Sequence, residues 1–312
     1  MAVLIGRRST LRPIIKAAAL AVLGSIALTS MAQAATFTSL YVFGDSYSDT
    51  GAYIPLTNGS TAAGYLAQDY GIPLTTPRNA NPGTSGINFA QSGARVDVGP
   101  TAPATQPQSL TQQVASFQAL VNSGAASFNP ASSLFFLAGG LNDHTRASQA
   151  SIAQATANQV STLYSLGARY FEIALLPAGI PAFTDSANFL NPVYTALVPQ
   201  LQAQFSDAVI RLSNWGAYYD DILNNPGRYG ITNTTDACQS GFGANATVCA
   251  TPNSYFYFIS AHPSDAAHRI VGDRLYQEAL ALPTVTVPEP ASLALFGVGL
   301  AGLGLVRRKR AA

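Results

Sequence analysis

The chain has 312 residues, of which 48% are hydrophobic and 10% are charged, and its formal net charge is +1. Half of the 16 Lys and Arg residues lie in the two terminal segments, so the middle of the chain has no basic patch and a nucleic-acid partner is not expected. Once both ends are set aside, the length allows one substantial core.

The first 34 residues have the layout of a secretory signal. Four basic residues precede the apolar run AAALAVLGSIAL, which is short for a membrane span. Ala32 and Ala34 then place small residues where a signal peptidase needs them. We therefore expect residues 1–34 to be a signal peptide cut after Ala34. The Arg7-Arg8 pair leaves both the general and the twin-arginine export routes open.

A short apolar strand, expected at Thr38–Phe43, runs into Gly44, Asp45 and Ser46. A Ser beside a Gly at a strand end can expose its hydroxyl and point its own N–H toward a developing oxyanion. Three residues recur by chance, however, and an ordinary turn with an Asx cap explains Gly-Asp-Ser equally well. Ser46 is therefore a candidate nucleophile that needs support from elsewhere in the chain.

The middle of the chain alternates between expected strands and helices. Strands are expected at Ser133–Ala138 and Tyr170–Leu176, and helices at Ala147–Leu166 and Val193–Leu212, followed by a short apolar segment at Tyr218–Ile222. Apolar strands that alternate with helices indicate an α/β fold, a three-layer α/β/α arrangement with a central parallel sheet of the flavodoxin-like kind. The active site of such a fold lies beyond the carboxyl ends of the strands.

Two further polar segments follow expected strands or turns. GINFAQSGARV contains Gly93, and GGLND contains Asn142. Each residue has an ordinary structural explanation, since Gly93 fits a turn. Asn142 or Asp143 fits the cap of the helix expected from Ala147.

The chain has two cysteines, Cys238 and Cys249, which bound the Gly-rich loop CQSGFGANATVC. An even count in an exported chain indicates one disulfide, to which we assign no chemistry. His144 and His268 form no metal-ligand spacing, so we expect no metal and no cofactor. His268 falls on an expected helix, where a structural role is favoured.

The segment YFYFISAHPSDAAH adds His262 as the fourth block. Together and in this order, the four blocks resemble the GDSL esterases and lipases, also called SGNH hydrolases, with Ser46, Gly93, Asn142 and His262 in the named positions. The resemblance implies hydrolysis of a carboxylic ester, lipid or acylated saccharide, with Ser46 as nucleophile and His262 as base. It also implies an oxyanion hole made by the N–H groups of Ser46 and Gly93 and the Asn142 amide. Tyr47 replaces the Leu of the family's nickname, and we expect no chemical role for it.

The family's last block usually reads Asp-x-x-His, but Ile259 occupies the Asp position here. A serine protease that loses this carboxylate loses on the order of 10⁴-fold in kcat. We favour a backbone carbonyl, of Ile259 or Ser260, as the acceptor that orients the ring of His262. The other candidates for the acid are the carboxylates of Asp265, Asp220 and Asp221.

Two wider alternatives remain open. Asp265-Ala-Ala-His268 repeats the family spacing one step along and would make His268 the base, but Pro263 and Ser264 support the register on His262. The missing acid also fits a catalytically weak or inactive domain that acts as a surface or exopolysaccharide-matrix binding protein. Against that alternative, the residues of all four blocks are retained, and a dead site has no need of them.

The C-terminus combines Pro288-Glu289-Pro290, the apolar run ASLALFGVGLAGLGLV and the basic cluster RRKR. This layout resembles the PEP-CTERM sorting signal of Gram-negative bacteria. The resemblance implies that residues 284–312 hold a hydrophobic helix with transient membrane association and are processed by an exosortase. The chain would be delivered to the periplasm, cell surface or extracellular matrix. A plain C-terminal anchor predicts the same topology before processing. Residues 35–283 are left as the SGNH hydrolase domain.

Overall fold

The computed structural model describes residues 35–81, 84–98 and 107–285. Its centre is a five-stranded sheet in which every pair of neighbouring strands is parallel. The strand order is β2-β1-β3-β4-β5, so the first strand lies inside the sheet and β2 and β5 form its edges. The strands are β1 Ser39–Gly44, β2 Gly86–Asn88, β3 Ser133–Ala138, β4 Tyr170–Ala174 and β5 Val209–Ser213.

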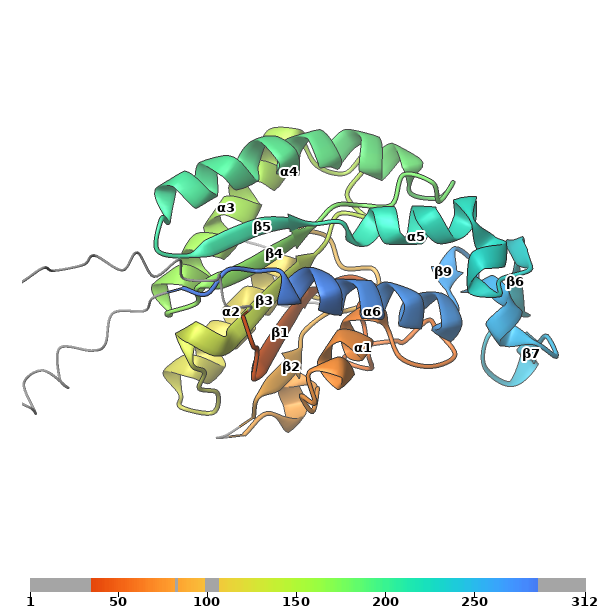
Figure 1. Ribbon diagram of the computed structural model, residues 1–312, viewed down its shortest axis with the longest axis horizontal. Helices are drawn as coiled ribbons and strands as arrows, with labels where there is room; N and C mark the ends of the chain where they lie inside the picture. The colour runs from red at the N-terminus through yellow and green to blue at the C-terminus, as the bar shows by residue number, and fades with distance from the viewer. Residues whose placement is uncertain (1–34, 82–83, 99–106, 286–312) are drawn as a thin grey trace, which may run out of the picture. The chain divides into compact units, whose positions relative to one another are not determined.

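Helices cover both faces of this sheet, which is the predicted three-layer α/β/α fold (Figure 1). Helix α6 contacts α1 and α5, and it runs in front of the strands in Figure 1, whereas α3 contacts α2 and α4 and lies behind them. The α-helices are α1 Ala62–Asp69, α2 Leu110–Asn122, α3 Gln149–Ser165, α4 Thr184–Gln204, α5 Trp215–Asn224 and α6 Asp265–Leu280. Short 3₁₀ turns are η1 Pro77–Asn79, η2 Pro130–Ser132, η3 Pro226–Tyr229, η4 Gly243–Asn245 and η5 Pro252–Ser254.

The central strands are buried along their whole length. Every residue of β1, β3 and β4 is buried, as expected for a parallel sheet with helices on both faces. Aromatic side chains fill much of the core, and Tyr41 stacks on Phe135 while Phe43 stacks on Phe89. The register of β1 and β3 pairs Gly44 with Ala138, so the carboxyl ends of these two strands lie side by side. The aromatic packing stabilises this arrangement.

A second, smaller sheet stands beyond the carboxyl end of the first. Its order is β7-β6-β8-β9, with β6 Asn233–Ser240, β7 Thr247–Val248, β8 Tyr255–Ile259 and β9 His262–Pro263. The predicted disulfide joins Cys238 on β6 to Cys249, just after β7. Cys238, Phe258 and Ile259 form a hydrophobic cluster of their own, against which Leu56 packs. The segment that carries His262 therefore belongs to this second sheet.

Some expected elements have different bounds in the structure. Helix α4 begins at Thr184, well before the expected start at Val193, because Pro192 and Pro199 lie inside the helix although proline normally marks a helix boundary. The expected helix also ran through β5, whose β-branched Val209 and Ile210 favour a strand. The segment at 218–222 is part of α5.

The expected signal peptide, residues 1–34, lies outside the described residues, as does most of the expected sorting segment, residues 284–312, with its apolar run. Among the helices that the structure describes, none is long and apolar enough to cross a bilayer.

Removing the disulfide should destabilise the fold without changing its sheet. The bond closes a loop over a sequence separation of 11, for which loss of the constraint costs about 3 kcal/mol, or a fall in Tm of roughly 5–10 °C. Circular dichroism melting of Cys238→Ala/Cys249→Ala measures this. Ser240→Ala/Thr247→Ala is the matched control, because it removes only the hydroxyl contact across the same two strands. Equal Tm values for the two double variants would contradict the expectation.

Candidate active site

Ser46 lies in the turn that directly follows β1. The end of that strand is held by Gln113 on α2, whose side chain both accepts from the Gly44 N–H and donates to the Gly44 carbonyl, each at 2.9 Å. A β-carbon on Gly44 would meet the Ala138 carbonyl at 2.7 Å, so a larger residue does not fit there. The backbone of Gly44, from which the turn begins, is therefore held in place. Ser46 itself is buried, with 8% of its surface exposed.

His262, the first residue of β9, faces Ser46. Its Nε2 lies 2.8 Å from Ser46 Oγ, and its Nδ1 lies 3.3 Å from the carbonyl oxygen of Ile259. A carbonyl oxygen only accepts hydrogen bonds, so Nδ1 must carry the proton and Nε2 presents its lone pair to the hydroxyl. This is the tautomer that a general base needs.

In the part of the chain that the structure describes, no hydrogen bond or ion pair joins Asp265 to the imidazole of His262. It is the first residue of α6, and its Oδ1 accepts from the Ser60 N–H at 3.0 Å and from the hydroxyl of Tyr65. Its own N–H donates to Asn58 Oδ1 at 2.8 Å. These bonds attach the start of α6 to α1 and to the segment before it. The Nδ1 of His262 is bound by the Ile259 carbonyl instead.

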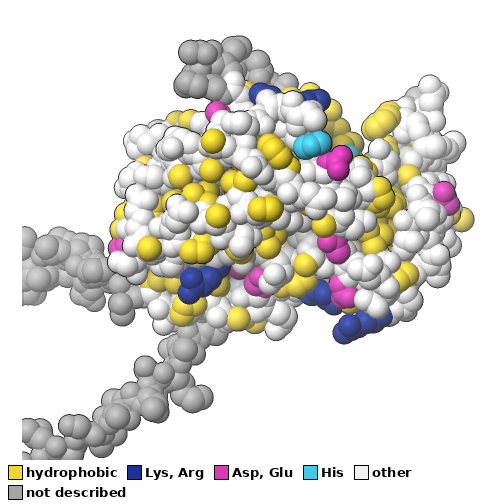
Figure 2. Space-filling model, turned by 90° about the horizontal axis from the view of Figure 1, so that it is seen from above, with side chains coloured by type: hydrophobic (Ala, Val, Ile, Leu, Met, Phe, Trp, Pro, Cys, Tyr) yellow, Lys and Arg dark blue, Asp and Glu magenta, His cyan; other side chains and the backbone are white. Residues whose placement is uncertain are grey.

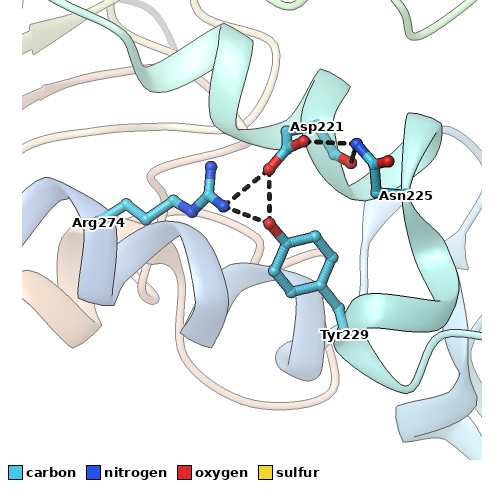
Figure 3. A network of polar contacts seen from close by, with 4 residues as sticks. All are labelled: Asp221, Asn225, Tyr229 and Arg274. Atoms are coloured by element: carbon cyan, nitrogen blue, oxygen red, sulfur yellow. Dashed lines mark hydrogen bonds and ion pairs between the residues drawn. The ribbon is translucent and has the colours of Figure 1, made fainter.

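The two acidic residues on α5 are also committed elsewhere. Asp220 accepts from the N–H groups of Ala178 and Gly179 at 3.0 and 2.8 Å. Asp221 binds Arg274 on α6 at 2.7 Å, as well as the Tyr229 hydroxyl and the Asn225 amide (Figure 3). This network joins α5 and η3 to α6, so its role is structural.

Gly93 and Asn142 lie on neighbouring loops. The Asn142 Nδ2 donates to the carbonyl of Ala94 at 2.9 Å, which leaves its second N–H available. Gly93 has a φ of +84°, a backbone conformation that favours glycine. Among the described residues, no acceptor binds the N–H of Gly93 or of Ser46. Neither Asn142 nor Asp143 caps the following helix, because Ser148 is the N-cap of α3.

Three buried carboxyl groups, to which the sequence analysis assigned no role in the site, hold these loops together. Asp45 accepts from the N–H groups of Tyr47 and Leu141, at 3.2 and 3.4 Å, and so joins the Ser46 turn to the Asn142 loop. Asp143 accepts from the Val96 N–H at 3.0 Å. Asp49 accepts four N–H groups, including that of Ser92 at 2.9 Å. The sequence could have indicated these three carboxyl groups, because they lie close to Ser46 or Asn142 along the chain.

Burial dominates the electrostatics of the site. It raises the pKa of Asp45 to about 7 and that of Asp143 to about 6. It also lowers the pKa of His262, and the hydrogen bond that Nδ1 donates to the Ile259 carbonyl opposes this only in part. His268 lies buried on α6 with its Nδ1 2.8 Å from the Tyr219 hydroxyl, and burial lowers its pKa to about 3. Burial therefore favours the neutral form of both His262 and His268.

Two exposed apolar residues lie near the segments that carry Gly93 and His262: Ile54 next to Ser92, and Val248 on the strand beside β6. Figure 2 shows a hollow between the main body and the lobe formed by β6 and β7, with hydrophobic side chains along it. The large hydrophobic residues exposed in the described chain are Tyr53, Ile54, Phe242 and Val248. The Ile54 carbonyl accepts from the hydroxyl of Ser92, beside Gly93, and Gln239 on β6 pairs with Ile259. In the described ranges, no cluster of three or more His, Cys, Asp or Glu residues could hold a metal ion.

The fold is thus a parallel α/β sheet that carries a contacting Ser–His pair, Ser46 and His262, at its carboxyl edge. The profile of the family described as GDSL-like Lipase/Acylhydrolase matches residues 40–275. The chain therefore belongs to the GDSL-like lipase/acylhydrolase family. A second profile, the PEP-CTERM protein-sorting motif, matches residues 286–310.

Curated relatives carry esterase names. The chain is 26% identical to acetylajmalan esterase 2 of Rauvolfia serpentina, over 78% of this chain and 91% of that protein. It is 24% identical to a GDSL esterase/lipase of Arabidopsis thaliana, over 70% of this chain and 73% of the relative. These relatives support an ester-cleaving type of hydrolase.

Solved structures of similar kind include a member of the lipolytic G-D-S-L family from Veillonella parvula. It has 13% identity and a TM-score of 0.45, covering 78% of this chain and 99% of that one. A catalytic mutant of an acetylxylan esterase from Geobacillus stearothermophilus has 15% identity and a TM-score of 0.42, covering 82% and 99%.

The environment of His262 predicts its titration. Because burial disfavours the imidazolium, the C2 proton of His262 should titrate below the ordinary pKa of 6.5, while His268 stays neutral down to about pH 3. Proton NMR of the full chain, assigned with His262→Gln and His144→Gln, measures both. A His262 pKa of about 7 or higher, the direction in which a nearby carboxylate moves it, would contradict the carbonyl arrangement.

Proposed function

We propose that this chain is an exported serine esterase that cleaves carboxylic esters through an acyl-Ser46 intermediate. The observation that carries the proposal is the 2.8 Å contact between Ser46 Oγ and His262 Nε2 at the carboxyl edge of the sheet. The membership in an acylhydrolase family supports the same chemistry.

In the first half-reaction, Ser46 Oγ attacks the ester carbonyl carbon and its proton passes to His262 Nε2. The new Oγ–C bond gives a tetrahedral oxyanion. His262 then returns the proton to the alcohol oxygen as the C–O bond to the alcohol breaks. The alcohol leaves, and the acyl group stays on Ser46.

In the second half-reaction, water repeats the sequence. His262 takes a proton from the water while the water oxygen adds to the acyl carbon. The bond to Ser46 Oγ then breaks, and Oγ takes the proton back from His262. The products are a carboxylic acid and the free enzyme, so atoms and charge balance without a metal or cofactor.

The oxyanion is assigned to the N–H groups of Ser46 and Gly93 and to the free amide N–H of Asn142. The first two lack an acceptor among the described residues, and the Ala94 carbonyl orients the Asn142 amide. A preorganised donor of this kind is typically worth about 3 kcal/mol of the barrier.

The Ile259 carbonyl fixes the tautomer of His262 in place of the family's usual Asp carboxylate. It offers only a dipole, whereas the carboxylate carries a full negative charge. The imidazolium that forms in the transition state is therefore less stabilised than in a triad. We expect a working Ser–His dyad with a modest kcat.

A second candidate function rests on the same departure. Ile259 at the acid position fits a weak or inactive domain that binds material at the cell surface or in an exopolysaccharide matrix. Fluorophosphonate labelling separates the two, because only a live nucleophile at Ser46 reacts.

Substrate and location follow the sequence signals. We infer that the signal peptide and the PEP-CTERM motif send the chain through the export machinery and an exosortase to the periplasm, surface or matrix of a Gram-negative bacterium. An ester of a lipid or an acylated saccharide is the proposed substrate, and exposed apolar side chains such as Ile54, next to Ser92 and Gly93, suit its acyl part.

The nucleophile is tested by paired serine variants. Ser46→Ala should remove all hydrolysis of a short-chain nitrophenyl ester above background, because no other hydroxyl faces His262 Nε2 within the described chain. Ser48→Ala is the matched control, since the buried Ser48 hydroxyl two residues away has no partner there and should be dispensable. Equal rates for wild type and Ser46→Ala would remove the esterase proposal.

The acid is tested by Asp265→Asn. Because the Asp265 carboxylate binds Ser60 and Tyr65, the variant should keep kcat within about threefold and lose only about 1 kcal/mol of stability. Tyr65→Phe is the control that removes one of the same bonds from the other side. A fall in kcat of about 100-fold, far more than one hydrogen bond gives, would make Asp265 the acid.

A further inference from the structure

The turn that carries His262 has little conformational support of its own. Ile259 pairs with His262, so only Ser260 and Ala261 connect β8 to β9. Ser260 has a φ of +51°, a region that favours Gly, Asn or Asp in two-residue hairpin turns. Neither residue of this turn is of that kind. The conformation is therefore imposed from outside the turn.

One outside contact comes from Tyr47, the neighbour of the nucleophile. Its hydroxyl donates to the Ala261 carbonyl at 2.5 Å, across a sequence separation of 214. Its ring lies 5.6 Å from the His262 ring, measured between centroids. A single side chain thus contacts both the residue before the base and the base itself.

Tyr47 is itself held in place. It is completely buried, and its ring packs edge-on against Phe183, Trp215 and Tyr219, with centroids 5.4 to 5.6 Å away. The titratable groups that face it are Tyr219, Tyr257, Asp45, Asp220, His262 and His268. Burial raises its pKa well above the ordinary value, so the hydroxyl remains a donor across the working range of pH.

The other side of the turn is anchored through Ile259. Its side chain packs with Cys238 and Phe258 in the hydrophobic cluster of the second sheet. The hydrogen bond that His262 Nδ1 donates to the Ile259 carbonyl is 3.3 Å long and has a neutral acceptor, so it is weak compared with a bond to a carboxylate. Additional restraint on the turn is needed if the imidazole is to stay in line with Ser46.

We propose that Tyr47 is a positioning residue for His262, whose hydroxyl clamps the Ala261 carbonyl and so keeps the Ile259 carbonyl against Nδ1. This assignment rests on the proposed esterase function. It gives a task to a position where the sequence alone indicated none.

The test compares two buried tyrosines in the full-length chain. Tyr47→Phe removes the hydrogen bond to the Ala261 carbonyl. Tyr219→Phe removes another hydroxyl from the same cluster of aromatic rings, but that hydroxyl contacts His268 and not the turn. For each variant we would measure kcat and KM on a short-chain nitrophenyl ester, Tm, and the His262 pKa by NMR. End-point fluorophosphonate titration counts competent sites. Should Tyr47→Phe not fold, Tyr47→Met, whose unbranched side chain adapts to irregular space, replaces it.

For Tyr47→Phe we expect kcat to fall at least tenfold while KM stays within twofold. The His262 pKa should fall further, because a loosened Ile259 carbonyl stabilises the imidazolium less. Tyr219→Phe should keep kcat within twofold and leave the His262 pKa unchanged. Unchanged kcat and pKa in Tyr47→Phe, or an equal loss in Tyr219→Phe, would overturn the proposal.

The NMR measurement separates the two levels of inference. A wild-type chain without any ester hydrolysis would remove the proposed function. The positioning of His262 would then be judged by its titration alone, which supports the clamp if Tyr47→Phe shifts the pKa and overturns it if the pKa stays the same.

Discussion

The hydrogen bond between the Ile259 carbonyl and His262 Nδ1 sets the conditions under which the rest of the site must work. A carbonyl fixes the tautomer of the imidazole but adds no charge, so the ring depends on geometry more than on electrostatic attraction. Much of the surrounding structure bears on that geometry. The second sheet, the buried Tyr47 and the cluster around Ile259 all act on the four residues from 259 to 262.

The Ser46 side of the site is held in place by a different set of interactions. The parallel sheet brings the ends of β1 and β3 to one edge, and buried carboxyl groups join the loops that follow. Asp45 connects the Ser46 turn to the loop of Asn142, and Asp49 binds the backbone next to Gly93. Burying carboxyl groups is costly, as the raised pKa of Asp45 indicates, and each one receives backbone N–H groups in return. The loops therefore carry their N–H groups in fixed directions.

The sequence predicted the parallel sheet and its three inner strands, β1, β3 and β4, because buried strands leave clear local patterns. It misplaced the start of α4, where Pro192 and Pro199 are accommodated within a helix, and it missed the edge strands β2 and β5 and the second sheet. Strands as short as β7 and β9 have no periodicity to detect. The sequence also left open which of several groups meets His262 Nδ1. That choice depends on hydrogen bonds between residues far apart in the sequence: Asp220 accepts from the Gly179 N–H and Asp265 accepts from the Ser60 N–H, so neither carboxylate is directed to the imidazole.

The disulfide described above has a bearing on when the site becomes complete. Cys238 packs against Ile259, so the covalent bond of the β6–β7 hairpin lies one strand away from the carbonyl that orients the imidazole. Disulfides persist in oxidising compartments and are rare in the reducing cytoplasm. A newly made chain lacks this disulfide, and the bond forms in an oxidising compartment, the kind of compartment to which an export signal leads. Maturation of the scaffold and arrival at the destination are thereby coupled within a single molecule.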